Sequence, residues 1–150
     1  MKTGKGKTNL VNEMKLRLPS LSVNESMARA AVAAFCAQTD PDATEIADIK
    51  CAVSEAVTNC IVHAYRNTVG VIYITVRLYE DRTVEIAIRD CGCGIEDVRE
   101  ARRPLYTTDA EGERSGMGFT VMESFCDKVR VLSRCGKGTT VTLYKRLGRR

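Results

Sequence analysis

The chain has 150 residues, a usual size for one domain with a hydrophobic core of its own. Hydrophobic residues make up 44% of it and charged residues 28%, as in soluble globular domains. No apolar run approaches the roughly 20 residues that a membrane span needs, and the N-terminus lacks the apolar segment of a secretory signal. We therefore expect a cytoplasmic protein that does not enter a membrane.

The net charge is +4, with basic residues concentrated at both ends of the chain. A surface that binds nucleic acid usually interleaves basic residues with exposed aromatic ones. Aromatic residues account for only 5% of this chain and tryptophan is missing, so we expect no direct nucleic-acid partner.

The seven cysteines are an odd number and are spread through apolar segments. In a chain without an export signal they are expected to be reduced, mostly buried thiols. Cys91 and Cys93 form a C-x-C pair, but a second Cys or His pair at zinc-finger spacing is missing. We therefore expect no structural metal site.

The first regular elements are predicted to be a strand and a helix. From Met14 to Leu18, apolar and basic residues alternate with the period of a half-buried strand. Ser22 to Glu25 matches a capping box, which opens an alanine-rich helix that reaches about Gln38.

A longer helix is predicted from about Ala43 to Tyr65. Asp40-Pro41-Asp42 interrupts the chain before it, because proline suits a first helical turn and aspartate suits a cap. Apolar residues at three- and four-residue spacing give this helix a stripe that should lie against a sheet.

Two β-hairpins are predicted at residues 71–89 and 128–146, each with β-branched strands around a short turn. Residues 95–115 between them are polar and show no core periodicity, so they are predicted to form a mobile loop or lid. Residues 116–127, GMGFTVMESFCD, are predicted to form a helix opened by glycines.

This order of elements predicts an α+β fold: a two-layer sandwich in which helices cover one face of a mostly antiparallel, mixed sheet. The domain is expected to span residues 13–146. A disordered extension over residues 1–12 precedes it and a basic tail at 147–150 follows it.

Polar residues recur at four-residue spacing in SEAVTNCIVHAY, at Glu55, Asn59 and His63. Residues four apart on a helix project from the same side, so these three can share one site. The amide oxygen of Asn59 is a hard ligand suited to Mg²⁺, and Glu55 could polarise an attacking hydroxyl. The alternative is a solvated polar stripe on an amphipathic helix.

Two glycine motifs follow. In DCGCG, Asp90 could accept a hydrogen bond from the amine of an adenine, while Gly92 and Gly94 let the backbone approach a ligand. In RSGMGF, glycines at a helix start offer free N–H groups to an anion, and Arg114 adds a charged donor. Each motif alone also fits an ordinary turn or a glycine-capped helix. Walker A and Rossmann glycine motifs are missing.

In this order, the three motifs resemble the N, G1 and G2 boxes of the ATP-binding superfamily of gyrase, Hsp90, histidine kinases and MutL (GHKL, the Bergerat fold). Within it, SEAVTN, RDCGCGI, ARRPLYTT and ERSGMGFTVMESF are most similar to the anti-sigma F factor family of sporulation serine kinases. The resemblance covers roughly residues 13 to 145.

The resemblance implies a role for each site residue. Asn59 would ligate Mg²⁺, Glu55 would be the general base, and ATP would be bound, with ADP in the product state. The adenine would be held by Asp90, Gly92 and Gly94, together with Thr139 or Thr140. The triphosphate would be lined by Thr107, Thr108, Arg114, Gly116 and Gly118. His63 is expected to be structural rather than a phosphoacceptor.

The resemblance also implies partners. The family binds a sigma F-like sigma factor, phosphorylates a serine of an anti-anti-sigma factor, and acts as a homodimer. Arg29 matches an arginine that the family uses to contact both proteins; a solvated helix charge is the alternative. Two other functions stay open: a related switch kinase for a stress-response sigma factor, and a nucleotide-binding module that only sequesters.

This sequence departs from the family in the predicted lid, where Asp109-Ala110 replaces a Lys-Pro pair that relatives often carry. The change removes a positive charge and a rigid backbone angle near the phosphates. The cysteines of DCGCG also replace acidic or aliphatic residues, which adds oxidisable thiols beside the site.

Overall fold

The computed structural model describes residues 8–103 and 118–148, and everything below concerns those residues. The elements are β1 (Leu10–Pro19), α1 (Val23–Cys36), η1 (Ala37–Thr39), α2 (Ala43–Asn59), η2 (Cys60–Ala64), β2 (Val71–Tyr79), β3 (Thr83–Asp90), α3 (Val98–Ala101), α4 (Gly118–Phe125), β4 (Lys128–Arg134) and β5 (Gly138–Arg146). The predicted order of strand, two helices, hairpin, helix and hairpin is confirmed. The short helix α3 was not predicted, because it lies in the polar stretch assigned to the loop.

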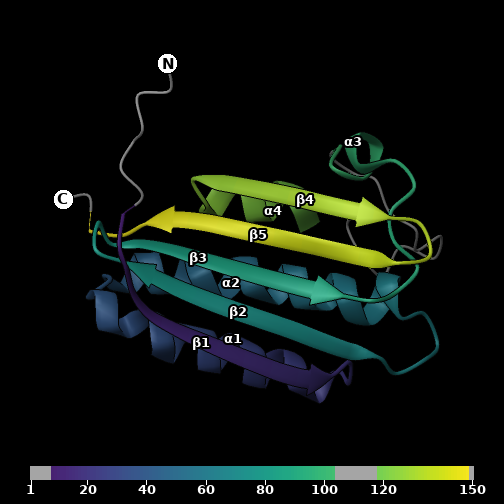
Figure 1. Ribbon diagram of the computed structural model, residues 1–150, viewed down its shortest axis with the longest axis horizontal. Coiled ribbons are helices and arrows are strands. Elements are labelled where there is room, and N and C mark those ends of the chain that lie inside the picture. Colours follow the sequence, from purple (N-terminus) through teal and green to yellow (C-terminus); the bar gives the residue numbers. More distant parts are fainter. Residues whose placement is uncertain (1–7, 104–117, 149–150) are drawn as a thin grey trace.

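The strands form one sheet in the order β1-β2-β3-β5-β4. Figure 1 shows α1, α2 and α4 together behind one face of this sheet. The predicted α+β sandwich with helices on one face is therefore confirmed. All pairings among the described strands are antiparallel, so the mixed character that we expected is not seen there.

Both ends of the folded domain extend beyond the predicted limits. Strand β1 begins at Leu10, which pairs with Tyr79, so residues 10–12 belong to the sheet and not to a disordered extension. At the other end, Leu147 is only 1% exposed and donates its N–H to the Arg82 carbonyl at 3.0 Å. Residues 10–12 join the domain through strand pairing, and Leu147 joins it through burial of its side chain. The polar sequence around them had led us to place both outside the domain.

The two long helices begin differently. The predicted capping box at the start of α1 is wrong: Ser22 makes no side-chain cap, and Glu25 instead accepts a hydrogen bond from Ser54 on α2. Helix α2 begins with a complete capping box, in which the Asp42 carboxylate accepts the Glu45 N–H at 2.8 Å and Glu45 accepts the Asp42 N–H at 3.0 Å. The aspartate cap is confirmed, and Pro41 lies just outside the helix.

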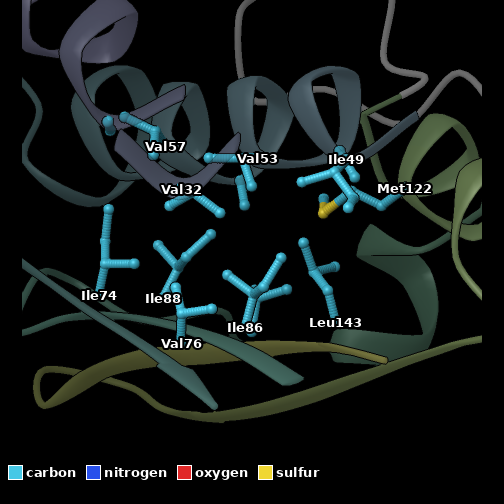
Figure 2. Close-up of a cluster of buried hydrophobic side chains, with 14 of the residues drawn as sticks. Val32, Ile49, Val53, Val57, Ile74, Val76, Ile86, Ile88, Met122 and Leu143 are labelled. Carbon is cyan, nitrogen blue, oxygen red and sulfur yellow. The ribbon is translucent and has the colours of Figure 1, made fainter. Parts of the chain in front are cut away.

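The core lies between α2 and the sheet (Figure 2). Side chains of α1, α2 and α4 face those of the central strands, and all are at most 2% exposed: Val32, Ile49, Val53, Val57, Ile74, Val76, Ile86, Ile88, Met122 and Leu143. Burying one such side chain contributes about 1.5–3 kcal/mol. This packing holds α2, and the polar residues on its other side, in a fixed position against the sheet.

All seven cysteines are free thiols, as expected. The expectation that most are buried is wrong, because four are exposed: Cys51, Cys91, Cys93 and Cys135. Three of these lie in the turns at one end of the sheet, where short apolar runs do not imply burial. Burial raises the pKa of the Cys36 thiol to about 12. None of the described helices is long and apolar enough to cross a membrane.

Candidate functional site

The first site residues come from α2 and from the start of α4. A Cβ placed on Gly118 would lie 3.3 Å from Glu55 Oε2 and 3.5 Å from Asn59 Oδ1. A side chain at position 118 would therefore lie against Asn59 and press slightly on the end of the Glu55 side chain. The polar helix and the glycine-opened helix, predicted as separate motifs, meet at this point.

Glu55 and Asn59 lie one turn apart on α2 and are half-buried. Within residues 8–103 and 118–148, neither side chain has a hydrogen-bond or ion-pair partner. A carboxylate and an amide oxygen thus lie beside the N-terminal end of α4, and neither is bonded to another side chain or main-chain group in the described part of the chain. A helix N-terminus attracts anions through its free N–H groups and its dipole.

Asp90 ends β3 and is only 5% exposed. Its Oδ1 accepts hydrogen bonds from the N–H of Gly92 at 3.0 Å and of Thr139 at 3.2 Å, and the Cys60 thiol lies 3.6 Å from Oδ2. Burial raises the pKa of Asp90, while the two backbone N–H bonds act in the opposite direction. A carboxylate offers about four acceptor positions, so these partners leave room for a ligand donor.

The glycines of DCGCG allow the loop to approach the protein's own backbone. A Cβ on Gly92 would lie 2.3 Å from the Ala64 carbonyl oxygen, which also accepts the Cys93 N–H at 3.1 Å. Gly94 has φ +77°, and a Cβ there would lie 2.2 Å from the Arg134 oxygen. The loop is therefore clamped between η2 and the β4–β5 turn. These contacts account for the absence of a Cβ at both positions, and the predicted contact of the two glycines with a ligand stays a prediction.

Two residues of this region were not identified from the sequence. The Tyr65 hydroxyl accepts the Cys91 N–H at 2.6 Å and donates to the Val71 carbonyl at 2.7 Å. Gly138 has φ +113°, and a Cβ there would lie 2.1 Å from the Asp90 carbonyl oxygen. Only the CGKG turn signal pointed to Gly138, and no local pattern pointed to Tyr65.

The predicted helix over residues 43–65 changes from α to π geometry at Cys60. Segments of π-helix are frequently found at functional sites. His63 lies in this segment, and its main-chain carbonyl accepts the Cys93 thiol at 3.3 Å. Its predicted structural role stays a prediction.

Of the two threonines predicted at the adenine, the structure brings one to Asp90. Thr139 is buried beside it, with its hydroxyl 2.7 Å from the Ser133 hydroxyl. Thr140 pairs with Arg89 and faces the opposite side of the sheet, because successive strand residues alternate in direction. Thr140 is therefore not part of this group.

Arg29 lies on α1 beside Ser54, which is in the last third of α2. Its Nη1 is 3.5 Å from Glu25 Oε1 and 3.4 Å from the Ser54 hydroxyl, and its side chain is 41% exposed. An ion pair this exposed adds little stability. Arg29 is thus held on the surface next to α2, and it does not contact Asp90.

Four predicted phosphate residues, Thr107, Thr108, Arg114 and Gly116, and the departure at Asp109-Ala110 lie outside the described residues. The part of the chain that is described holds no group of three or more His, Cys, Asp or Glu able to bind a metal. Mg²⁺ bound with a nucleotide needs only one or two protein oxygens, because phosphates and waters supply the rest. The unpartnered Asn59 oxygen fits that requirement.

Comparison with known proteins identifies the family of the chain. Residues 18–145 match the model of the histidine kinase-like ATPase domain. The anti-sigma F factor of Anoxybacillus flavithermus is 57% identical over 91% of this chain and 93% of its own length. The anti-sigma F factor of Caldanaerobacter subterraneus is 56% identical over 92% of this chain and 96% of its own.

Solved structures show the same fold. The RsbU and RsbW domains of a Mycobacterium tuberculosis protein match 93% of this chain and 34% of that one, with a TM-score of 0.69 and 25% identity. The histidine kinase domain of a blue-light activated kinase from Erythrobacter litoralis matches 82% of this chain and 61% of that one, with a TM-score of 0.55 and 18% identity. The chain belongs to the anti-sigma F factor family, within the family of histidine kinase-like ATPase domains.

Proposed function

We propose that the chain is an ATP-dependent protein-serine kinase that also acts as an anti-sigma factor. It would bind a sigma F-like sigma factor, phosphorylate a serine of an anti-anti-sigma partner, and work as a homodimer in the cytoplasm. Support comes from relatives named anti-sigma F factor that match more than nine-tenths of this chain. The kinase-like ATPase domain supports the use of ATP.

The observation that carries the proposal is the meeting of Glu55, Asn59 and Gly118. Phosphoryl transfer depends mainly on positioning and on neutralising charge, with one residue directed at the attacking oxygen. Glu55 lies beside the start of α4, where the N–H groups favour phosphate, and it has no other partner among the described residues. A carboxylate placed this way suits the orientation of a serine hydroxyl.

Each residue then has one task. Asp90, with Thr139 beside it, accepts the adenine amine, and the hydrogen bond from the Gly92 N–H in the clamped loop helps to hold its carboxylate in position. The N–H groups at the start of α4 orient the phosphates. Glu55 holds the serine hydroxyl of the partner and accepts its proton as the serine oxygen bonds to the γ-phosphorus of ATP. The bond between that phosphorus and the β–γ bridging oxygen breaks, so that phosphoserine forms and ADP leaves. Asn59 would hold Mg²⁺, which supplies neutralisation of the phosphate charge.

Two other functions differ in testable ways. A switch kinase for a stress-response sigma factor would use the same site and differ only in its partners. A module that binds nucleotide and only sequesters would have no use for a carboxylate at position 55. The unpartnered state of Glu55 beside Gly118 therefore favours a kinase.

A pull-down from the source cell, with MgATP or MgADP present, tests the proposal. We expect a sigma factor in one nucleotide state and an anti-anti-sigma protein in the other, and mass spectrometry should find phosphoserine on the latter after incubation with MgATP. A sigma factor recovered without any phosphorylated protein would support sequestration alone.

A further inference from the structure

Two exposed cysteines from different segments come together at the end of the sheet that carries Asp90. Cys93 belongs to the loop that follows β3, and Cys135 belongs to the turn between β4 and β5. Figure 1 shows the end of β3 and this turn at the same end of the sheet. The two residues are far apart in the sequence, so only the fold makes them neighbours.

The loop and the turn run past each other in opposite directions. Ile95 donates its N–H to the Ser133 hydroxyl at 2.7 Å. One residue earlier in the loop and one later in the turn, a Cβ on Gly94 would lie 2.2 Å from the Arg134 carbonyl oxygen. The next position on each side is a cysteine, so this order of contacts sets Cys93 opposite Cys135.

A printed backbone bond confirms that these two positions are close. The Gly136 N–H donates to the Cys93 carbonyl oxygen at 2.7 Å. Standard backbone dimensions then limit the distance between the Cα atoms of Cys93 and Cys135 to about 7.5 Å at most. Opposed residues of antiparallel segments lie about 4.5–5.5 Å apart, and a disulfide spans about 4.4–6.8 Å between Cα atoms. The pair therefore meets the distance requirement of a disulfide.

Both sulfur atoms are accessible and weakly held. The Cys93 thiol lies 3.3 Å from the His63 carbonyl oxygen and 3.5 Å from that of Gly94, and a thiol is a weak donor. Cys135 has no side-chain hydrogen bond within residues 8–103 and 118–148. Rotation of either side chain toward the other therefore breaks no strong bond.

Cys91, the third exposed thiol at this end of the sheet, is directed elsewhere. Its sulfur accepts a hydrogen bond from Arg89 Nη1 at 3.4 Å. Ile88 points into the core, so Arg89 lies on the face away from the helices, whereas the Cys93 sulfur lies beside η2. The two thiols of the C-x-C motif thus diverge. They belong to no group of three His, Cys, Asp or Glu in the described residues that could bind a metal.

We propose that Cys93 and Cys135 form a redox-sensitive disulfide, which fastens the loop after Asp90 to the β4–β5 turn. The cytoplasm keeps thiols reduced, so the bond forms when a low-molecular-weight disulfide accumulates there. The loop and the strand that follows the turn each supply one N–H to Asp90 Oδ1, from Gly92 and Thr139. The disulfide covalently joins the two segments that orient this carboxylate. It does not depend on the proposed kinase activity.

The bond forms in two exchange steps. The Cys135 thiolate attacks one sulfur of the oxidant, so that a mixed disulfide forms and half of the oxidant leaves as a thiolate. The Cys93 thiolate then attacks the Cys135 sulfur, the Cys93–Cys135 bond forms, and the other half leaves. The two protein thiols lose two electrons, which the oxidant gains, and their two protons end on the two released thiols.

The disulfide should also stabilise the folded chain. It closes a segment that contains α4, and closing a segment restricts the unfolded chain more than the folded one. We expect the oxidised protein to have a Tm roughly 5–10 °C above that of the reduced protein.

The test exposes the full chain, without nucleotide, to mixtures of oxidised and reduced glutathione. Mass spectrometry of unreduced peptides should find Cys93 linked to Cys135 within one chain, and the Tm should rise with the linked fraction. Cys135→Ser should abolish both the link and the rise. Cys51→Ser, at an exposed thiol of α2, should preserve both. Because nucleotide is left out, the outcome is separate from success or failure of the proposed function.

Three results would overturn the proposal. A peptide that links Cys91 to Cys93 or to Cys135 would assign the reactivity to another pair. Glutathione adducts without a Cys93–Cys135 link would show that the two sulfur atoms do not meet. A covalent dimer on a non-reducing gel would place the bond between two copies of the chain. All three are read on the wild type, so none depends on the folding of a variant.

Discussion

Asp90 Oδ1 accepts a hydrogen bond from the Thr139 N–H at 3.2 Å, although 49 positions separate the two residues in the sequence. The contact exists because β3 and β5 pair antiparallel and place the two residues opposite each other. A second bond, from the Gly92 N–H at 3.0 Å, fixes the same oxygen. The carboxylate is therefore oriented by the sheet and by the loop together.

Asp90→Asn is expected to lower ATP affinity while the protein stays folded. The amide oxygen of asparagine can still accept the two backbone bonds, but the charged acceptor for the adenine amine is lost. A hydrogen bond to a charged group contributes about 1.5–3 kcal/mol, which corresponds to roughly tenfold to a hundredfold weaker binding. Titration calorimetry measures the change, and equal affinity would remove Asp90 from adenine recognition.

The pH dependence of stability should differ between the wild type and Asp90→Asn. Burial raises the pKa of Asp90 in the folded state, so the folded protein holds this proton more tightly than the unfolded chain does. Protonated Asp90 therefore contributes to the stability of the wild type. This contribution is fully present below about pH 3.9, the pKa of an aspartate in the unfolded chain, and is lost as the pH rises through the higher pKa of Asp90 in the folded protein. Between acid and neutral pH, the free energy of unfolding of the variant should therefore rise relative to that of the wild type.

Urea unfolding of both proteins across this range measures the difference, and other titrating groups cancel in the comparison. A difference that stays constant, or that shrinks toward neutral pH, would contradict a raised pKa at Asp90.

Glu55→Ala is expected to abolish phosphate transfer and to leave ATP binding intact. Removing a general base typically slows a reaction by about 10²–10⁴-fold. Glu55 has no partner among the described residues, so its loss leaves no group unsatisfied and the fold should persist. Transfer of labelled phosphate to the partner's serine gives the rate, with Lys50→Ala on the same helix as the control. Undiminished transfer would exclude Glu55 as the base.

Gly92→Ala and Gly136→Ala form a matched pair of loop variants. The new Cβ at Gly92 would lie 2.3 Å from the Ala64 oxygen, so we expect a loss of about 1–3 kcal/mol in the free energy of unfolding and weaker ATP binding. Gly136 has φ +75° with open space around it, so the cost should be roughly 1 kcal/mol of backbone strain, and ATP affinity should not change. Equal loss of ATP affinity in both would contradict the clamped loop.

Local periodicity was sufficient to predict most of the fold. The two hairpins and the cap at Asp42 are confirmed because alternation, turn residues and capping act within a few residues. The false capping box at Ser22 and the missed start of β1 at Leu10 share another cause. In both cases a contact with a residue far away in the sequence determines the local structure: Ser54 bonds to Glu25, and Tyr79 pairs with Leu10.

The site was predictable as a set of motifs, and its geometry was not. Glu55, Asn59 and Asp90 were identified by residue type and spacing, but their meeting with Gly118 or Thr139 depends on tertiary packing. Only the register of β5 shows which of Thr139 and Thr140 lies beside Asp90, because a shift of one residue along a strand moves a side chain to the opposite face of the sheet. Tyr65 gave no local signal, because its hydroxyl serves main-chain groups of two other segments.

The most direct test of the central claim is a crystal structure with Mg²⁺ and a non-hydrolysable ATP analogue. We expect the adenine amine at the Asp90 carboxylate, the metal bound to the Asn59 amide oxygen, and the phosphates at the start of α4 beside Gly118. An analogue bound at any other surface, or a metal held without Asn59, would contradict the account.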